Sequence, residues 1–315
     1  MIIPENRYSY PKKKKTILKR IIIILIILLV IFSVLPLIKF KRNSLTIHST
    51  TSVSPEGKSL EELWIDSKYK ELTEKCEKIL SIDPLNAQGL IYNGFAYFHL
   101  GIAQFTLEEQ LPLLDLAVIN LRKALLLKSH PLAGKVNYIL GKSYYHKGRF
   151  YMDQAIYHIE KAIELDYTNE DSYKYLGLSY SELGLYEKGI QYFLKAINNE
   201  YNDMLLLVLG QTYHKLGDDV NSELYLKRAI ELHSDFRVEI KSRFLLGKIF
   251  FENADFEKAE EQYNLILSKD STSSDAHYYL GEIYSEKGNA VKARAEWRKA
   301  LELDPSHYGA LLRLY

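Results

Sequence analysis

Cysteine is nearly absent from the 315-residue sequence, which contains only Cys76. A single cysteine cannot form an internal disulfide, and it cannot build a zinc site from several thiolates. No two of the nine histidines have the helical spacing of a metal site that includes a general-base glutamate. Gly141, Lys142 and Ser143 are similar to the end of a phosphate-binding loop, but Val136 stands where that motif needs a glycine. We therefore expect no catalytic residue, no metal and no cofactor, and a protein that is not an enzyme.

Acidic side chains are scarce at the start of the chain, where residues 1–42 carry ten basic side chains and one acid, Glu5. Residues 43–315 have 31 basic and 39 acidic side chains, so their net charge is −8 although the whole chain has +1. A mildly acidic domain does not attract a phosphate backbone. We expect no nucleic-acid partner, and the basic tail directly precedes an apolar run that gives it another role.

This apolar run extends from Ile21 to Ile38, where only Ser33 and Pro36 interrupt the aliphatic and aromatic side chains. As a helix it would span about 27 Å, which is enough to cross a bilayer. Seven basic residues precede the run and three follow it closely. By the positive-inside rule, the short N-terminus is then cytoplasmic and the rest of the chain is exported.

We accordingly expect a single-pass protein of a bacterial inner membrane. It would have a basic cytoplasmic tail (1–20), a transmembrane helix (21–38), a flexible Ser- and Thr-rich linker (39–58) and a periplasmic domain (59–315). A cleaved signal peptide is the alternative. Its apolar run is usually about 7 to 15 residues long and ends in small residues, whereas this run ends in large aliphatic ones.

Six times after residue 58, a glycine follows a run of helix-forming apolar residues and is itself followed three residues later by an aromatic. The glycines lie 47, 36, 33, 37 and 34 residues apart. A recurrence near 34 residues is typical of stacked helical hairpins, which complete each other's core. The pairs are Gly94/Tyr97, Gly141/Tyr144, Gly177/Tyr180, Gly210/Tyr213, Gly247/Phe250 and Gly281/Tyr284.

The last unit shows the pattern most fully. Counted from Ser274 as position 1, its key residues stand at positions 4, 7, 8, 11, 15, 20, 24, 27 and 32; they are His277, Leu280, Gly281, Tyr284, Gly288, Ala293, Trp297, Ala300 and Pro305. This unit resembles the tetratricopeptide repeat. The resemblance covers residues 59–315, with about six to seven repeats, and implies an all-α, right-handed superhelical solenoid of helical hairpins. No domain-sized segment remains outside the repeats for an enzyme.

In repeats of this family, the first helix of each hairpin lines a concave groove, chiefly through positions 2, 5, 9 and 12. Lysines and aromatics at these positions would suit an extended peptide with apolar anchors and acidic groups or a C-terminal carboxylate. The alternative is that some of the aromatics pack between hairpins. The candidate partner-binding residues are Phe95, Phe98, Lys135, Tyr138, Lys142, Tyr145, Lys174, Leu207, Lys241, Phe244, Lys248 and Phe251.

Two further segments depart from the repeat. Residues 102–116 contain 11 residues more than the period allows, so we expect either longer helices or a protruding loop, with a role in binding or none. Residues 308–315 begin a new helix with three leucines, for which we expect either self-association or burial against Trp297.

The sequence therefore predicts a membrane-tethered scaffold that binds partner proteins or peptides on the exported side. The alternative function is a non-catalytic subunit of an envelope-polymer assembly or secretion complex.

Overall fold

The computed structural model describes residues 58–127, 131–232 and 234–315. Within these residues the regular elements are all helical. The predicted basic tail, the predicted transmembrane helix and nearly all of the predicted linker lie outside the described residues. No helix in the described part combines the length and the apolar character that crossing a bilayer requires.

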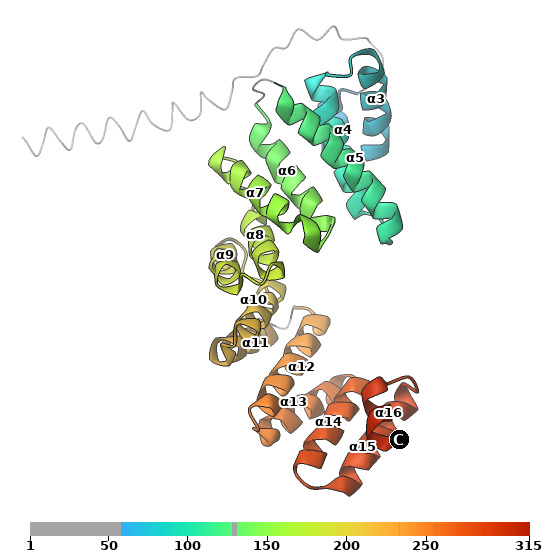
Figure 1. Cartoon of the computed structure of the whole chain (residues 1–315), viewed down its shortest axis with the longest axis vertical. Helices are drawn as coiled ribbons and strands as arrows, with labels where there is room; N and C mark the ends of the chain where they lie inside the picture. Colours follow the sequence, from blue (N-terminus) through green and yellow to red (C-terminus); the bar gives the residue numbers. More distant parts are fainter. Residues whose placement is uncertain (1–57, 128–130, 233) are drawn as a thin grey trace, which may run out of the picture. The chain divides into compact units, whose positions relative to one another are not determined.

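Consecutive helices pack as pairs, and each pair also packs against the next pair along the chain (Figure 1). The predicted all-α stack of hairpins is confirmed. The pairs are α2 (Leu60–Ile65) with α3 (Tyr69–Ile82), α4 (Ala87–Ile102) with α5 (Leu107–Leu126), α6 (Ala133–His146) with α7 (Met152–Glu164), α8 (Ser172–Glu182) with α9 (Tyr186–Asn199), α10 (Asp203–Leu216) with α11 (Asp219–Leu232), α12 (Phe236–Glu252) with α13 (Phe256–Lys269), and α14 (Ser274–Glu286) with α15 (Ala290–Leu303); a short 3-10 helix, η1 (Arg149–Tyr151), precedes α7, and α16 (Tyr308–Leu314) follows α15.

The recurring glycines are points of close approach in the six pairs from α4 with α5 to α14 with α15. A Cβ atom on Gly281 would lie 2.4 Å from Cδ1 of Trp297, and one on Gly247 would lie 2.7 Å from Cζ of Tyr263. Both distances are too short for any side chain, so the glycine and the large ring from the second helix are sterically matched. This is the physical origin of the spacing that the sequence repeats.

Local signals fix the ends of the helices that carry the groove positions. The side chain of Asn202 accepts a hydrogen bond from the backbone N–H of Leu205 (2.8 Å) and starts α10. Gly217 ends the same helix in a left-handed conformation, with φ of +87°. The Asp235 carboxylate caps the start of α12 by accepting from the backbone N–H of Arg237.

The extra residues at 102–116 lengthen both helices of their hairpin, which is one of the two predicted outcomes. Helix α4 continues to Ile102, and α5 begins at Leu107 after Thr106, whose hydroxyl caps it. Phe105 at the turn is fully exposed, and Leu107 is 66 % exposed. A function for this longer hairpin stays a prediction.

The last helix, α16, packs on α15 through buried Ala310, and its Arg313 forms an ion pair with Glu282 of α14. The Arg313 guanidinium also lies over the ring of Trp297 (5.9 Å). Part of the helix is therefore covered, as one of the two alternatives predicted. Leu312 is nonetheless 64 % exposed, and self-association through this face stays a prediction.

Candidate binding groove

All twelve candidate residues lie on first helices of hairpins, namely α4, α6, α8, α10 and α12. Four of them are core residues. Phe95 and Phe98 have no exposed surface, Leu207 is 2 % exposed and Tyr138 is 3 % exposed. The neighbouring hairpins close over these side chains, so they pack in the interior and offer little surface to a partner.

Three other candidates come together in one hollow. Helices α10, α12 and α14 enclose a groove of about 540 Å³, which we call the C-terminal groove. Lys241, Phe244 and Lys248 line it from α12. The complete lining is Gln211, His214 and Lys215 from α10, Lys241, Phe244, Leu245 and Lys248 from α12, and Tyr279 from α14.

The floor of the C-terminal groove is aromatic. The ring of Phe244 meets the ring of Tyr279 edge-on at 6.5 Å and the ring of buried Tyr263 at 5.8 Å. Tyr263 and Tyr279 stack on each other at 5.1 Å. The groove is therefore shaped by rings that the core holds in place, and it offers a preformed apolar surface.

The rim of the C-terminal groove is cationic, because no aspartate or glutamate lines it. Among the described residues, no carboxylate lies within ion-pair distance of Lys215 or Lys241, and both side chains are exposed. Lys248 lies 3.6 Å from Glu252, a loose contact on the helix surface. The groove thus combines an apolar floor with two lysines, Lys215 and Lys241, that no carboxylate of the described residues pairs with.

His214 also lines this groove. Its Nδ1 lies 2.8 Å from Oδ1 of Asp219, and its Nε2 lies 3.8 Å from Oε2 of Glu252. These contacts link α10 to α11 and α12, so the imidazole is held by its own neighbours and is less available to a ligand than the lysines are.

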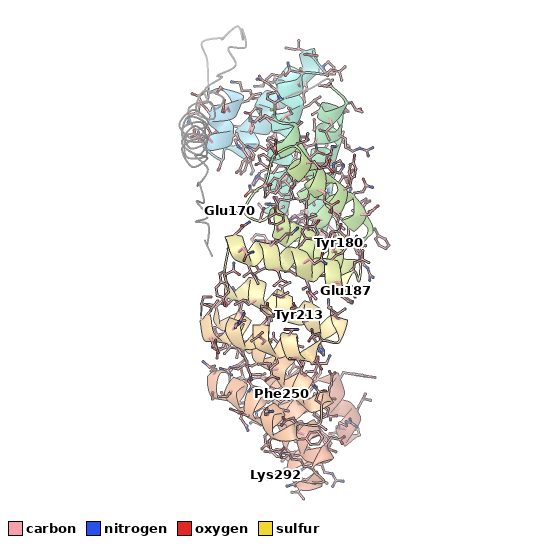
Figure 2. The ribbon with its side chains drawn as sticks, turned by 90° about the vertical axis from the view of Figure 1, so that its left-hand side faces the viewer. Glu170, Tyr180, Glu187, Tyr213, Phe250 and Lys292 are labelled. Atoms are coloured by element: carbon pink, nitrogen blue, oxygen red, sulfur yellow. The ribbon has the colours of Figure 1, made fainter. Side chains whose placement is uncertain are left out.

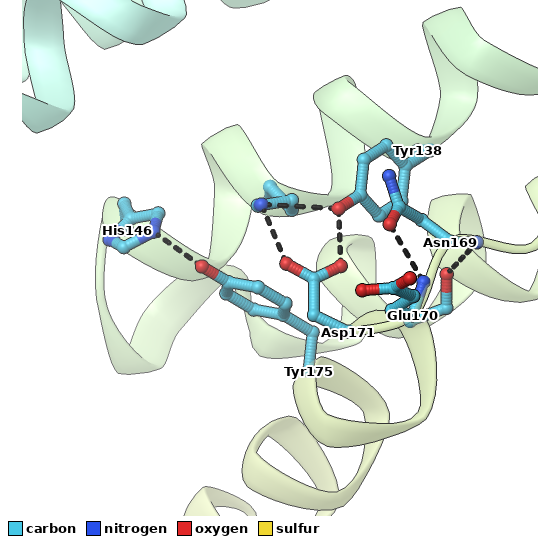
Figure 3. Close-up of polar contacts among 8 residues, drawn as sticks. Tyr138, His146, Asn169, Glu170, Asp171 and Tyr175 are labelled. Atoms are coloured by element: carbon cyan, nitrogen blue, oxygen red, sulfur yellow. Dashed lines mark hydrogen bonds and ion pairs between the residues drawn. The ribbon is translucent and has the colours of Figure 1, made fainter. Parts of the chain in front are cut away.

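A different arrangement occupies the corresponding part of α6 and α8 (Figure 3). The hydroxyl of Tyr138 donates to Oδ1 of Asp171, and Nζ of Lys142 donates to Oδ2 of the same carboxylate at 2.9 Å. Nearby, Nε2 of His146 lies 3.2 Å from the hydroxyl of Tyr175. We call these five residues the N-terminal cluster. Its lysine is already paired within the chain.

Lys135, another candidate on α6, is also engaged internally. Its Nζ lies over the rings of Trp64 (4.7 Å) and Phe95 (5.2 Å). Burial lowers the pKa of Lys135. An ammonium group that lies over two rings in this way stabilises the packing of α6 on the first two hairpins.

The remaining candidates are separate from the C-terminal groove. Lys174 lines a smaller hollow of about 370 Å³ between α8 and α10, together with Leu178 and Met204. Tyr145 packs edge-on against Tyr175 (5.0 Å), and Phe251 packs against Phe256 (5.7 Å). The structure therefore brings together Lys241, Phe244 and Lys248, and it distributes the other candidates along the stack.

Sequence reasoning missed five residues that line the C-terminal groove, one of which is Leu245 at position 6 of its repeat. Gln211 and His214 stand at positions 9 and 12 of their repeat when Gly210 is position 8, so the groove rule itself would have found them. Lys215 and Tyr279 stand at positions 13 and 6, outside that rule. Their exposure depends on how far successive hairpins rotate, which a single repeat does not reveal.

Aromatics at position 11 form a separate series outside the groove. Figure 2 shows Tyr180, Tyr213 and Phe250 following one another along the stack. Lysines of the second helices lie over rings of this series: Lys188 over Tyr180 (5.2 Å), Lys258 over Phe250 (5.3 Å) and Lys292 over Tyr284 (5.0 Å). Each of these lysines packs on a ring of its own hairpin, and none of them lines the C-terminal groove.

Family models for the tetratricopeptide repeat match residues 274–307, 175–203 and 205–236. The predicted repeats are thus found in the middle and at the end of the chain. Proteins built from these repeats mediate protein–protein contacts and are typically non-catalytic scaffolds. Among the described residues, no group of three or more His, Cys, Asp and Glu side chains is arranged to hold a metal ion.

The fold matches a solved structure, the C-terminal part of a TPR repeat-containing protein from Cytophaga hutchinsonii. The two are 20 % identical with a TM-score of 0.63, and the match covers 81 % of this chain and 98 % of that one. This similarity supports the repeat fold.

Two curated relatives are subunits of the anaphase-promoting complex. Subunit CDC16 from Saccharomyces cerevisiae is 28 % identical over 141 residues, which is 43 % of this chain and 17 % of the relative. Subunit 3 from Schizosaccharomyces pombe is 26 % identical over 240 residues, which is 75 % of this chain and 33 % of the relative. The matches span a third or less of these relatives.

Proposed function

We propose that the chain is a scaffold that binds an extended segment of a partner protein in the C-terminal groove. The observation that carries this proposal is the combination of a preformed aromatic floor with two rim lysines, Lys215 and Lys241, that have no carboxylate partner among the described residues. An apolar side chain of the partner would lie against Phe244 and Tyr279, and acidic groups would contact Lys215 and Lys241. Burial of an apolar anchor supplies affinity, and the charges supply specificity and a faster encounter.

Recovery of partners by the full chain, extracted in mild detergent, tests this proposal. Lys241→Glu combined with Lys248→Glu reverses two charges on the rim and should reduce recovery of the partner at least about tenfold, since like charges at an interface repel. The matched control, Lys70→Glu with Lys78→Glu, reverses two exposed charges on α3 and should leave recovery unchanged. Equal recovery by both double variants would reject the groove as the binding site.

The tether is the second element of the proposal. The apolar run at residues 21–38 and its basic flank support an uncleaved membrane anchor, with the repeats on the exported side. A reporter that works only in an oxidising compartment, fused after Tyr315, should be active, and added lysines after residue 38 should weaken its activity. Activity of a cytoplasm-only reporter would overturn this topology, and a mature chain that begins near Lys41 would identify a signal peptide.

A second candidate is a non-catalytic subunit of a larger envelope-polymer or secretion assembly. The curated relatives, which are subunits of a multiprotein complex, favour a role inside an assembly. The two candidate functions predict different stoichiometries. A subunit co-purifies with several proteins in a fixed ratio, whereas an adaptor co-purifies with one partner that can dissociate and be replaced.

A further inference from the structure

Asp171 stands at a position where an aspartate normally caps a helix. It is the residue immediately before α8, yet its side chain makes no capping hydrogen bond. An aspartate there usually accepts from the backbone N–H groups of the first turn. Both carboxylate oxygens of Asp171 are instead used by α6 of the preceding hairpin, which provides Tyr138 and Lys142.

The two donors form a site that fits one carboxylate. Tyr138 and Lys142 stand one helical turn apart on α6, with Nζ of Lys142 3.1 Å from the Tyr138 hydroxyl, so the two groups contact the two oxygens of a single carboxylate. Burial is the largest cause of the raised pKa of Tyr138, and the hydrogen bond to Asp171 raises this pKa further. The hydroxyl therefore stays protonated and donates at neutral pH.

Aromatic rings enclose the cation of this site. Nζ of Lys142 lies 4.7 Å from the ring centre of Tyr175, 5.1 Å from that of Tyr138 and 5.7 Å from that of Phe98. The side chains of Lys142 and Asp171 remain 14 % and 22 % exposed. Rings that exclude water strengthen the attraction between ammonium and carboxylate, and the exposed side leaves an approach from solvent.

We infer that Tyr138 and Lys142 form a carboxylate-binding site and that Asp171 fills this site from within the chain. This site is thereby closed to acidic partner segments, which are directed to the C-terminal groove. This inference deepens the proposed function and rests on it for its biological role. The site itself is defined by contacts within the chain and is testable separately.

The same repeat position behaves differently elsewhere. With the recurring glycine at position 8, Asp171 is at position 2 of its repeat, as are Lys241 in α12 and Asp275 in α14. Lys241 brings a positive charge to the C-terminal groove. Asp275 instead contacts Nε2 of His307 (3.0 Å) and is not part of the lining of the C-terminal groove. A carboxylate at position 2 therefore does not close the groove by default, and Asp275 provides a matched control.

The test measures binding of a synthetic pentapeptide, acetyl-Glu-Phe-Glu-Leu-Glu-amide, to the full chain by isothermal titration calorimetry. All variants carry Lys241→Glu, so that the C-terminal groove does not mask the result. Adding Asp171→Ala should tighten binding at least about tenfold, because it frees Tyr138 and Lys142. Adding Lys142→Ala to this variant should abolish the gain in affinity. Asp275→Ala in place of Asp171→Ala should produce no gain in affinity.

A second peptide, acetyl-Gln-Phe-Gln-Leu-Gln with a free C-terminus, separates side-chain carboxylates from a terminal carboxylate as the ligand. Asp171→Ser is the alternative variant if Asp171→Ala lowers the melting temperature, since serine is favoured immediately before a helix and its shorter side chain leaves the two donors free. Binding that does not tighten in either variant, or a gain that survives loss of Lys142, would overturn the inference. Binding to the chain with Lys241 intact tests the proposed function independently.

Discussion

The hairpins on either side of α9 share one packing scheme and differ in what their lysines do. In α6 and α8, Lys135 lies between aromatic rings and Lys142 is paired with Asp171. In α10 and α12, Lys215 and Lys241 are exposed and have no carboxylate partner among the described residues. The two regions therefore pack alike although the lysines at their groove positions have different surroundings, so these charges can change from repeat to repeat without altering the fold.

Replacing a packing glycine with leucine should destabilise the hairpins of both regions to a similar extent. This prediction has the largest expected effect. Gly141→Leu and Gly281→Leu should each lower the free energy of unfolding by about 1–3 kcal/mol, or more where the backbone cannot shift. A Cβ would meet Ile159 at 2.6 Å in the first case and Trp297 at 2.4 Å in the second. Urea unfolding of the full chain measures the change. An unchanged midpoint in either variant would contradict the shared packing.

The stability of the two regions should respond differently to acid. Burial lowers the pKa of His99, His146 and His158 to about 4 each. The unfolded chain, with histidine pKa values near 6.5, binds more protons than the folded chain between about pH 4 and 6.5, so stability falls as the pH falls through this window. The three histidines lie on α4, α6 and α7.

We therefore expect amide protection in α4–α7 to decrease more between pH 7 and pH 5 than protection in α12–α15, as measured by hydrogen exchange corrected for intrinsic rates. The pKa values of Glu239 and Glu260 in the later helices lie below their usual range, because salt-bridged lysine and arginine partners favour the charged forms. Their contribution is lost only at lower pH. An equal decrease in both regions would show that the histidines do not govern the acid response.

Replacing the lysine at position 2 of α12 with an aspartate should give the C-terminal groove the negative charge that Asp171 brings to the N-terminal cluster. Lys241→Asp should weaken binding of the acidic pentapeptide about tenfold, because it replaces an attractive charge with a repulsive one. Lys70→Asp on α3 is the control and should bind like the unmodified chain. If Lys241→Asp binds with unchanged affinity, the rim charges do not select the ligand.

The smallest effect concerns the lysines outside the groove. Lys292→Ala removes a cation from the ring of Tyr284 and should lower the free energy of unfolding by about 0.5–1 kcal/mol without changing peptide binding. Thermal unfolding together with calorimetric titration checks both parts. A loss of binding would place Lys292 in the recognition surface.

The sequence predicted the fold because packing and spacing are tied together: Gly281 must leave room for Trp297, and a glycine meets a side chain of the second helix in the same way in the five hairpins that precede it, from α4 and α5 onward. The groove was predicted less completely. Positions 5 and 9 were expected to face a partner, yet Tyr138 at position 5 and Phe95 at position 9 are covered by adjacent hairpins. Nothing in the sequence indicates that Asp171 contacts Lys142, because this contact depends on the rotation between neighbouring repeats and on the choice of one side-chain conformer.

The most direct test of this comparison is the rate at which each lysine is acetylated in the full chain, measured by mass spectrometry. We predict that Lys215 and Lys241 react fast and Lys142 reacts at least about tenfold more slowly, because its ammonium is paired and enclosed. Asp171→Ala should raise the rate at Lys142 and leave Lys241 unchanged. Equal rates at Lys142 and Lys241 in the unmodified chain would contradict the account.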